Sequence, residues 1–181
     1  RDGLRCKLTV IPCRGYTHRS RYRLPTAPSP NLPNMRAVYL YPSLCFFEGT
    51  PVSLGRGTDF PFQAYGHPEL QGDFSFTPRS NAGAKNPPLK DKRCHGVDLR
   101  TSPSDERIWE REVDLGYVID CYRQLNLGEK FFTPMFDRLT GTDYVRQMIL
   151  QGAGADRIKA SWADDVERFK QTRKPYLLYE E

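Results

Sequence analysis

The stretch YPSLCFFEGTPVSLGRGTDFPFQAYG, residues 41–66, holds the densest cluster of polar groups set among glycines in this chain. Glycine has no Cβ, so it permits left-handed backbone conformations and lets a ligand approach the main-chain amides. Arg56 stands between Gly55 and Gly57, which leaves its guanidinium on a thinly covered loop. A guanidinium can bind a carboxylate through two parallel hydrogen bonds. We therefore place the candidate functional site in this stretch.

Glu48 is a second charged side chain of the same stretch, and two interpretations of it are open. Its carboxylate can accept hydrogen bonds from sugar hydroxyls or act as a general acid or base. Alternatively, it pairs with Arg56 and holds the loop. Five aromatic residues flank the loop, and they either stack on sugar rings or belong to the core: Phe46, Phe47, Phe60, Phe62 and Tyr65.

Composition is that of a folded domain: 181 residues, 38% hydrophobic, 27% charged, with a net charge of +5. The GRGT segment lacks the spacing of a phosphate-binding loop, and we expect no nucleotide and no nucleic-acid partner. The five cysteines form no CxxC pair and the three histidines are dispersed, which predicts no metal site and no cofactor. No apolar run approaches the roughly 20 residues of a membrane span.

Local patterns predict an α+β fold, a mainly antiparallel sheet in the first half packed by about three helices from the second half. Residues 7–12, 36–41, 73–77 and 94–100 are the expected strands. Helices are expected at 112–125, at 143–150 and from Ser161, whose hydroxyl would cap the amide of Asp164. Trp162, Val166 and Phe169 give that last helix one apolar face. Residues 176–179 either add an edge strand or pack on the sheet.

A series of motifs runs through nearly the whole chain: VIPCRGYTH, SPNLPN, the EGT…GRGT stretch, GVDL, FDRLTGTDYVRQMI and RKPYLLY. In this order they resemble the C-terminal half of bacterial exo-β-N-acetylmuramidases, formerly a domain of unknown function. The most specific part is EGT…GRGT with the preceding SPN. The chain starts without Met and soon enters an apolar run, which also favours a longer protein.

The resemblance implies that residues 1–181 are a single C-terminal accessory domain, whose N-terminal, Rossmann-like catalytic domain is absent from this chain. The two would form the substrate cleft together, with the proposed catalytic carboxylates in the missing half. Asn31, Glu48, Thr50 and Arg56 would line the cleft from this side. Glu48 is the one catalytic candidate here, and a substrate-orienting role is expected for it.

The implied substrates are peptidoglycan fragments, from whose non-reducing end N-acetylmuramic acid is released by an exported enzyme. Muramic acid differs from glucosamine by a lactyl ether that carries a carboxylate, which suits Arg56. The chain alone should then be inactive. Two alternatives stand beside this hypothesis: a non-catalytic carbohydrate or cell-wall binding module, and a purely structural domain whose GRGT loop serves turn geometry.

Overall fold

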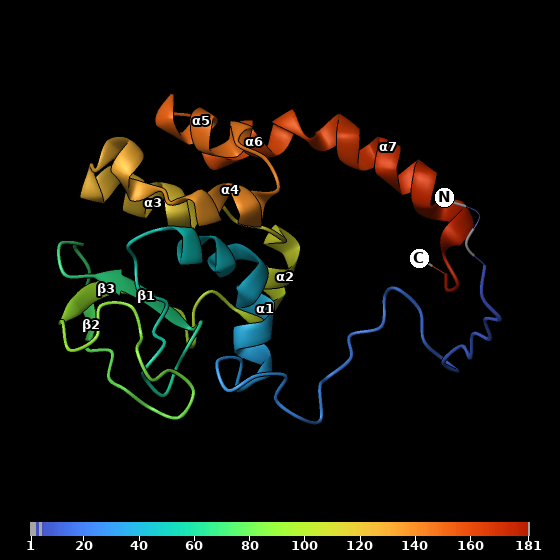
Figure 1. The fold of residues 1–181 in the computed structure, drawn as a ribbon, viewed down its shortest axis with the longest axis horizontal. Helices are drawn as coiled ribbons and strands as arrows, with labels where there is room; N and C mark the ends of the chain where they lie inside the picture. The colour runs from blue at the N-terminus through green and yellow to red at the C-terminus, as the bar shows by residue number, and fades with distance from the viewer. Residues whose placement is uncertain (1–2, 4, 181) are drawn as a thin grey trace. The chain divides into compact units, whose positions relative to one another are not determined.

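The structure, a computed structural model, describes residue 3 and residues 5–180. The chain forms two compact units, unit 1 with Arg1–Arg23 and Trp162–Glu181, and unit 2 with Leu24–Ser161. The elements combine helices with one small antiparallel sheet, so the predicted α+β class is confirmed (Figure 1).

The sheet of unit 2 has three strands in the order β1-β3-β2, with both pairs antiparallel: β1 Ala64–His67, β2 Phe74–Phe76 and β3 Cys94–Asp98. The predicted strands at 73–77 and 94–100 are confirmed as β2 and β3, whereas β1 was not predicted. Gly66 lies opposite Gly96. A Cβ on Gly66 would lie 2.7 Å from the carbonyl oxygen of His95, so the strands approach more closely here than side chains allow.

The remaining elements of unit 2 are helical: α1 Met35–Leu44, η1 Cys45–Gly49, α2 Asp105–Arg111, α3 Gly116–Leu125, η2 Gly128–Phe131, α4 Pro134–Thr140, α5 Tyr144–Leu150 and α6 Ala155–Ser161. In Figure 1, η1, drawn in teal, lies between the sheet and helices α3 and α4, and α1 runs beside the sheet. The largest buried side chains come from α1, η1, η2 and α4 to α6: Leu40, Leu44, Phe47, Phe131, Phe136, Ile149 and Ile158.

The strand predicted at 36–41 is wrong, because these residues belong to α1. Asn34 caps this helix, its Oδ1 accepting a hydrogen bond from the amide of Ala37 at 3.0 Å. Ala37, Leu40 and Leu44 recur at helical spacing and are fully buried. Burial of this face outweighs the β-propensity of the valine and the tyrosines.

The helices of the second half differ from the prediction at their boundaries. The helix expected at 112–125 begins at Gly116, because Glu112 adopts a φ of 57° where α2 ends. Ser161 does not cap Asp164: it ends α6, and its hydroxyl donates to the carbonyl oxygen of Ile158 at 2.7 Å. The helix expected at 143–150 is confirmed as α5.

Unit 1 consists of a strap, residues 5–23, together with α7 Ala163–Arg173, η3 Lys174–Tyr176 and the residues that follow. The strap meets the C-terminal segment through the amide of His18, which donates to the carbonyl oxygen of Glu180 at 2.9 Å. The strand predicted at 7–12 is wrong for this chain, because these residues pair with no strand in the described part and are exposed. Residues 176–179 likewise form no strand.

Candidate functional site

The GRGT loop is a tight turn held from two sides. Thr58 closes it, because its amide and its hydroxyl both donate to the carbonyl oxygen of Gly55, at 3.1 and 2.6 Å. Gly57 has a φ of 84°, and its carbonyl oxygen accepts from the amide of Arg79 at 2.9 Å. A Cβ at Gly57 would lie 2.6 Å from Cγ of Pro87. The loop therefore requires glycine both for its backbone conformation and for this close packing.

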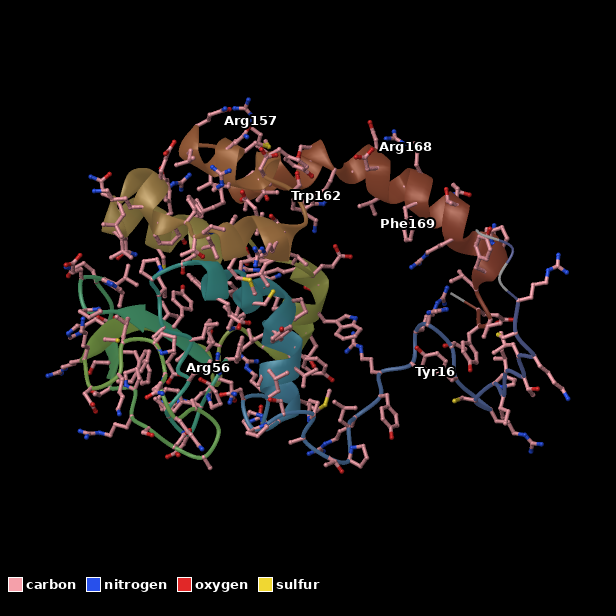
Figure 2. All side chains as sticks on the ribbon, viewed as in Figure 1. Tyr16, Arg56, Arg157, Trp162, Arg168 and Phe169 are labelled. Atoms are coloured by element: carbon pink, nitrogen blue, oxygen red, sulfur yellow. The ribbon has the colours of Figure 1, made fainter. Side chains whose placement is uncertain are left out.

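Arg56 lies at the centre of this turn, in the loops beside the small sheet (Figure 2). Its side chain is half-buried, and its Nε is a buried donor with no hydrogen-bond partner in the described structure. No carboxylate of the described residues forms an ion pair with it. A buried donor left unpaired costs about 1–3 kcal/mol. The turn thus carries a cationic group whose hydrogen-bonding capacity is not used within the fold.

Asn31 reaches the same region through its amide. Its Nδ2 donates to the carbonyl oxygen of Gly83 at 3.0 Å. Gly83 belongs to the turn between Asn81 and Ala84, and Nδ2 of Asn81 approaches the carbonyl oxygen of Thr58 at 3.5 Å. The structure therefore connects Asn31 and the GRGT loop to one and the same turn. The side-chain amide of Asn31 already uses one of its N–H groups to hold that turn.

Glu48 and Thr50 lie in and just after η1. The hydroxyl of Thr50 donates to the carbonyl oxygen of Phe47 at 2.9 Å and accepts from the amide of Val52 at 3.2 Å, so it closes its own turn. Between these residues, Gly49 packs directly on α4, where a Cβ would lie 2.7 Å from Cβ of Phe136. This end of the predicted site is anchored to the helices.

The carboxylate of Glu48 is exposed and faces two neighbours on the same helical surface. Burial, and then the charge of Glu48, raises the pKa of Cys45 to about 11. The pKa of Tyr41 is raised by the same two causes in the same order. Within the described residues Glu48 forms no ion pair or hydrogen bond with Arg56, so the structure does not hold the loop by that pair.

Most aromatic residues around the loop belong to the core. Phe47 stacks on Tyr65 with ring centroids 5.0 Å apart, and both are buried. Phe60 meets Phe76 edge to face at 5.9 Å. Phe62 is buried as well. These contacts are those of a packed interior, and only Phe46 and Phe60 of the five are half-buried and not fully buried.

The segment that supports the loop was not singled out from the sequence. Arg79, Asn81 and Pro87 come from a long polar segment after β2, and each contacts the GRGT loop. Their signal was the turn-forming run Asn81-Ala82-Gly83. Such a run predicts a turn. It does not predict that the turn packs on the GRGT loop, because this contact joins residues more than twenty positions apart in the sequence.

The described residues provide neither the geometry of a metal site nor a membrane-spanning helix. Among them, no three His, Cys, Asp or Glu side chains gather so that they could hold a metal ion. No helix formed by residue 3 and residues 5–180 is long and apolar enough to cross a membrane. The cysteines described are free thiols, and burial raises the pKa of Cys121 to about 12, with the charge of Asp120 adding to the effect.

Residues 39–179 match the family described as exo-beta-N-acetylmuramidase NamZ, C-terminal. The chain therefore belongs to this glycosidase family, as its C-terminal domain. The resemblance inferred from the motifs is confirmed.

Among its relatives is the peptidoglycan beta-N-acetylmuramidase NamZ of Bacillus subtilis (strain 168), 30% identical over 190 residues, which cover 95% of this chain and 45% of the relative. A crystal structure of a DUF1343 family protein from Bacteroides fragilis NCTC 9343 is 62% identical, with a TM-score of 0.94. It matches 97% of this chain and 50% of its own. A second DUF1343 protein of that organism shares the fold at 18% identity and a TM-score of 0.56, over 84% of this chain and 44% of its own. The chain spans about half the length of the relatives it matches.

Proposed function

We propose that this chain is the C-terminal, cleft-completing domain of an exported glycoside hydrolase that releases N-acetylmuramic acid from the non-reducing end of peptidoglycan fragments. The observation that carries the proposal is the buried, unpartnered Nε of Arg56 on a glycine turn. Membership of the family, and the relative named as a peptidoglycan beta-N-acetylmuramidase, support the substrate class.

The role of Arg56 follows from the chemistry of the sugar. The lactyl group of muramic acid ends in a carboxylate, which can accept two hydrogen bonds from one guanidinium. Arg56 forms no ion pair with a carboxylate of the described residues, so a carboxylate ligand at its terminal nitrogens supplies the charge partner that the fold does not. Glucosamine has no carboxylate and cannot do so. Arg56 thus selects muramic acid over glucosamine.

The remaining predicted residues divide between two places on the cleft wall. Asn31 lies with the GRGT loop, whereas Glu48 lies in η1 and Thr50 directly after it, beside α4. In this proposal they orient the sugar, Glu48 through its exposed carboxylate. The bond-breaking carboxylates belong to the preceding half of a longer protein, so the 181-residue chain hydrolyses nothing by itself. Retaining and inverting mechanisms differ in the separation of those carboxylates.

The test compares the two sugars in the longer protein, with Arg56→Lys as the variant. Lysine keeps the charge but loses the planar fork, so we expect affinity for muramic acid to fall by at least about tenfold, while affinity for glucosamine stays within about twofold. Isothermal titration with each sugar measures both. Arg79→Lys is the matched control, because Arg79 is an exposed arginine that contacts the same loop through its backbone.

Equal losses for the two sugars would remove the carboxylate-recognition role. A second measurement tests whether the preceding half carries the catalytic activity: hydrolysis of a chromogenic muramic-acid glycoside is compared between the 181-residue chain and the longer protein. Cleavage at matching rates would contradict the assignment of catalysis to the preceding half. Strong retention of the 181-residue chain on purified sacculi would favour the cell-wall binding module instead.

A further inference from the structure

Unit 1 contains apolar side chains but no core. In its described part, residue 3, residues 5–23 and residues 162–180, no side chain is buried. The buried apolar residues of the described chain all lie between Ala37 and Ile158, within unit 2. Exposed large apolar side chains occur in both units, but in the described part of unit 1 no buried residue accompanies them: Leu8, Val10, Ile11, Tyr16, Tyr22, Val166, Phe169, Tyr176 and Leu178.

Several of these side chains are almost fully exposed. Ile11 is 87% exposed and Tyr176 is 80% exposed. Phe169 points away from α7 on a different side from Arg168 (Figure 2). Single exposed apolar residues need no explanation, whereas nine of them in a unit with no buried side chain among its described residues favour a surface that another body covers.

The strap adds a second, independent observation. Residues 7–11 belong to no helix or strand, and their peptide groups form no hydrogen bond with one another or with the rest of the described residues. Their sequence, KLTVI, is typical of a strand. An extended segment of this kind adds to the edge of a sheet in another body, which supplies the missing main-chain partners.

The parts of unit 1 are nevertheless tied to each other. The amide of Cys13 donates to the hydroxyl of Tyr179 at 2.8 Å, and the rings of Tyr16 and Tyr179 meet edge to face at 4.8 Å. These contacts join the strap to the C-terminal segment without burying either. Unit 1 therefore presents its strap and its C-terminal segment together, as one surface for a partner.

We propose that unit 1 is a docking surface for the preceding half of the same, longer polypeptide, with residues 7–11 pairing along a strand edge of that half. This rests on the proposed function in one respect, the longer polypeptide, and not on sugar recognition. The relatives at 30% and 62% identity extend over about as much chain again outside the match. That length is sufficient for a second domain.

Charge and tethering favour this occupant over a second copy of the chain. The strap has no acidic residue between positions 5 and 23, and its basic residues are Arg5, Lys7, Arg14, Arg19, Arg21 and Arg23. Two straps facing each other would therefore repel, which disfavours a second copy of the chain. A half joined covalently to the strap also binds at a high effective concentration.

Hydrogen exchange followed by mass spectrometry tests the proposal on the 181-residue chain and on the longer polypeptide. We expect the amides of residues 8–11 to exchange at least about tenfold more slowly in the longer polypeptide. Equal exchange in the two proteins would overturn the proposal. Protection in the 181-residue chain that rises with its concentration would identify a second copy as the occupant, and would overturn it too.

Variants of the longer polypeptide locate the surface. Ile11→Glu together with Phe169→Glu should return the strap to the fast exchange of the 181-residue chain. Tyr144→Glu is the matched control, because Tyr144 is an exposed aromatic residue of α5 in unit 2, and it should leave the protection unchanged. Protection that survives the double substitution would exclude this surface.

The outcome separates from that of the proposed function, because no sugar enters the measurement. Arg56→Lys should leave the protection of the strap unchanged. Protection without selectivity for muramic acid would retain the docking surface and reject the sugar-binding role. Selectivity without protection would do the reverse.

Discussion

Gly57 shows at the scale of one residue how the candidate site is built. Its φ of 84° strains any other residue, and a Cβ would also lie 2.6 Å from Cγ of Pro87. We expect Gly57→Ala to lower the free energy of unfolding by about 3 kcal/mol, the sum of the backbone strain and the steric conflict. Chemical denaturation followed by circular dichroism measures it.

Gly141 is the matched control for this prediction. Its φ of 72° is similar, but a Cβ there meets nothing within 4 Å. Gly141→Ala should therefore cost about 1 kcal/mol, from strain alone. Equal losses at the two positions would mean that the segment carrying Pro87 gives way, and that it does not fix the loop that presents Arg56.

Among the elements, α1 depends on one long-range contact that sequence patterns do not reveal. Nε of Arg36 donates to the carbonyl oxygen of Leu99 at 2.7 Å, and its guanidinium also bonds Pro103 and Asp105. This side chain joins α1 to the segment before α2. Arg36→Met should lower the free energy of unfolding by about 2–4 kcal/mol, because charge-assisted bonds to main-chain oxygens are lost.

The control for α1 is Arg107→Met, on the exposed face of α2. Nη1 of Arg107 and Oε2 of Glu110 are 3.8 Å apart, and both side chains are about two-thirds exposed. This ion pair should therefore contribute less than about 0.5 kcal/mol to the free energy of unfolding. The same denaturation experiment compares the two variants. A similar loss for both would show that Arg36 acts as an ordinary surface charge.

The predictable elements are those whose cause is local. The alternation in DFSFT predicts β2, and the sequence from Asp143 to Gly152 predicts α5, because pattern and stop signal lie side by side. The helix α1 was missed because Val38, Tyr39 and Tyr41 favour a strand, while packing of the opposite face decides for a helix. Residues 7–12 have the propensity of a strand but pair with no strand in the part of the chain that the structure describes.

The candidate site, like the fold, has local features that the sequence predicts and long-range features that it does not. Glycines on both sides of Arg56 predict a tight turn, which is a local property and is readable from the sequence, whereas the side chain expected to be exposed is half-buried with a buried Nε. The anchoring of this turn by Arg79 and Pro87 is a long-range contact, and the sequence alone does not reveal it. The absence of an ion pair between Glu48 and Arg56, within the described residues, likewise depends on the three-dimensional course of the chain and is not readable from the sequence. The site assignments themselves stay predictions.

At the scale of the whole molecule, the buried apolar residues of the described chain belong to unit 2 alone. A chain reduced to residues 24–161 keeps every one of them. We therefore expect it to unfold cooperatively, with a midpoint within about 3 °C of that of the 181-residue chain. Differential scanning calorimetry of both measures the midpoint and the cooperativity. A loss of the cooperative transition, or a midpoint lower by more than about 10 °C, would show that unit 1 contributes to the stability of the core, and would leave less of its apolar surface for a partner.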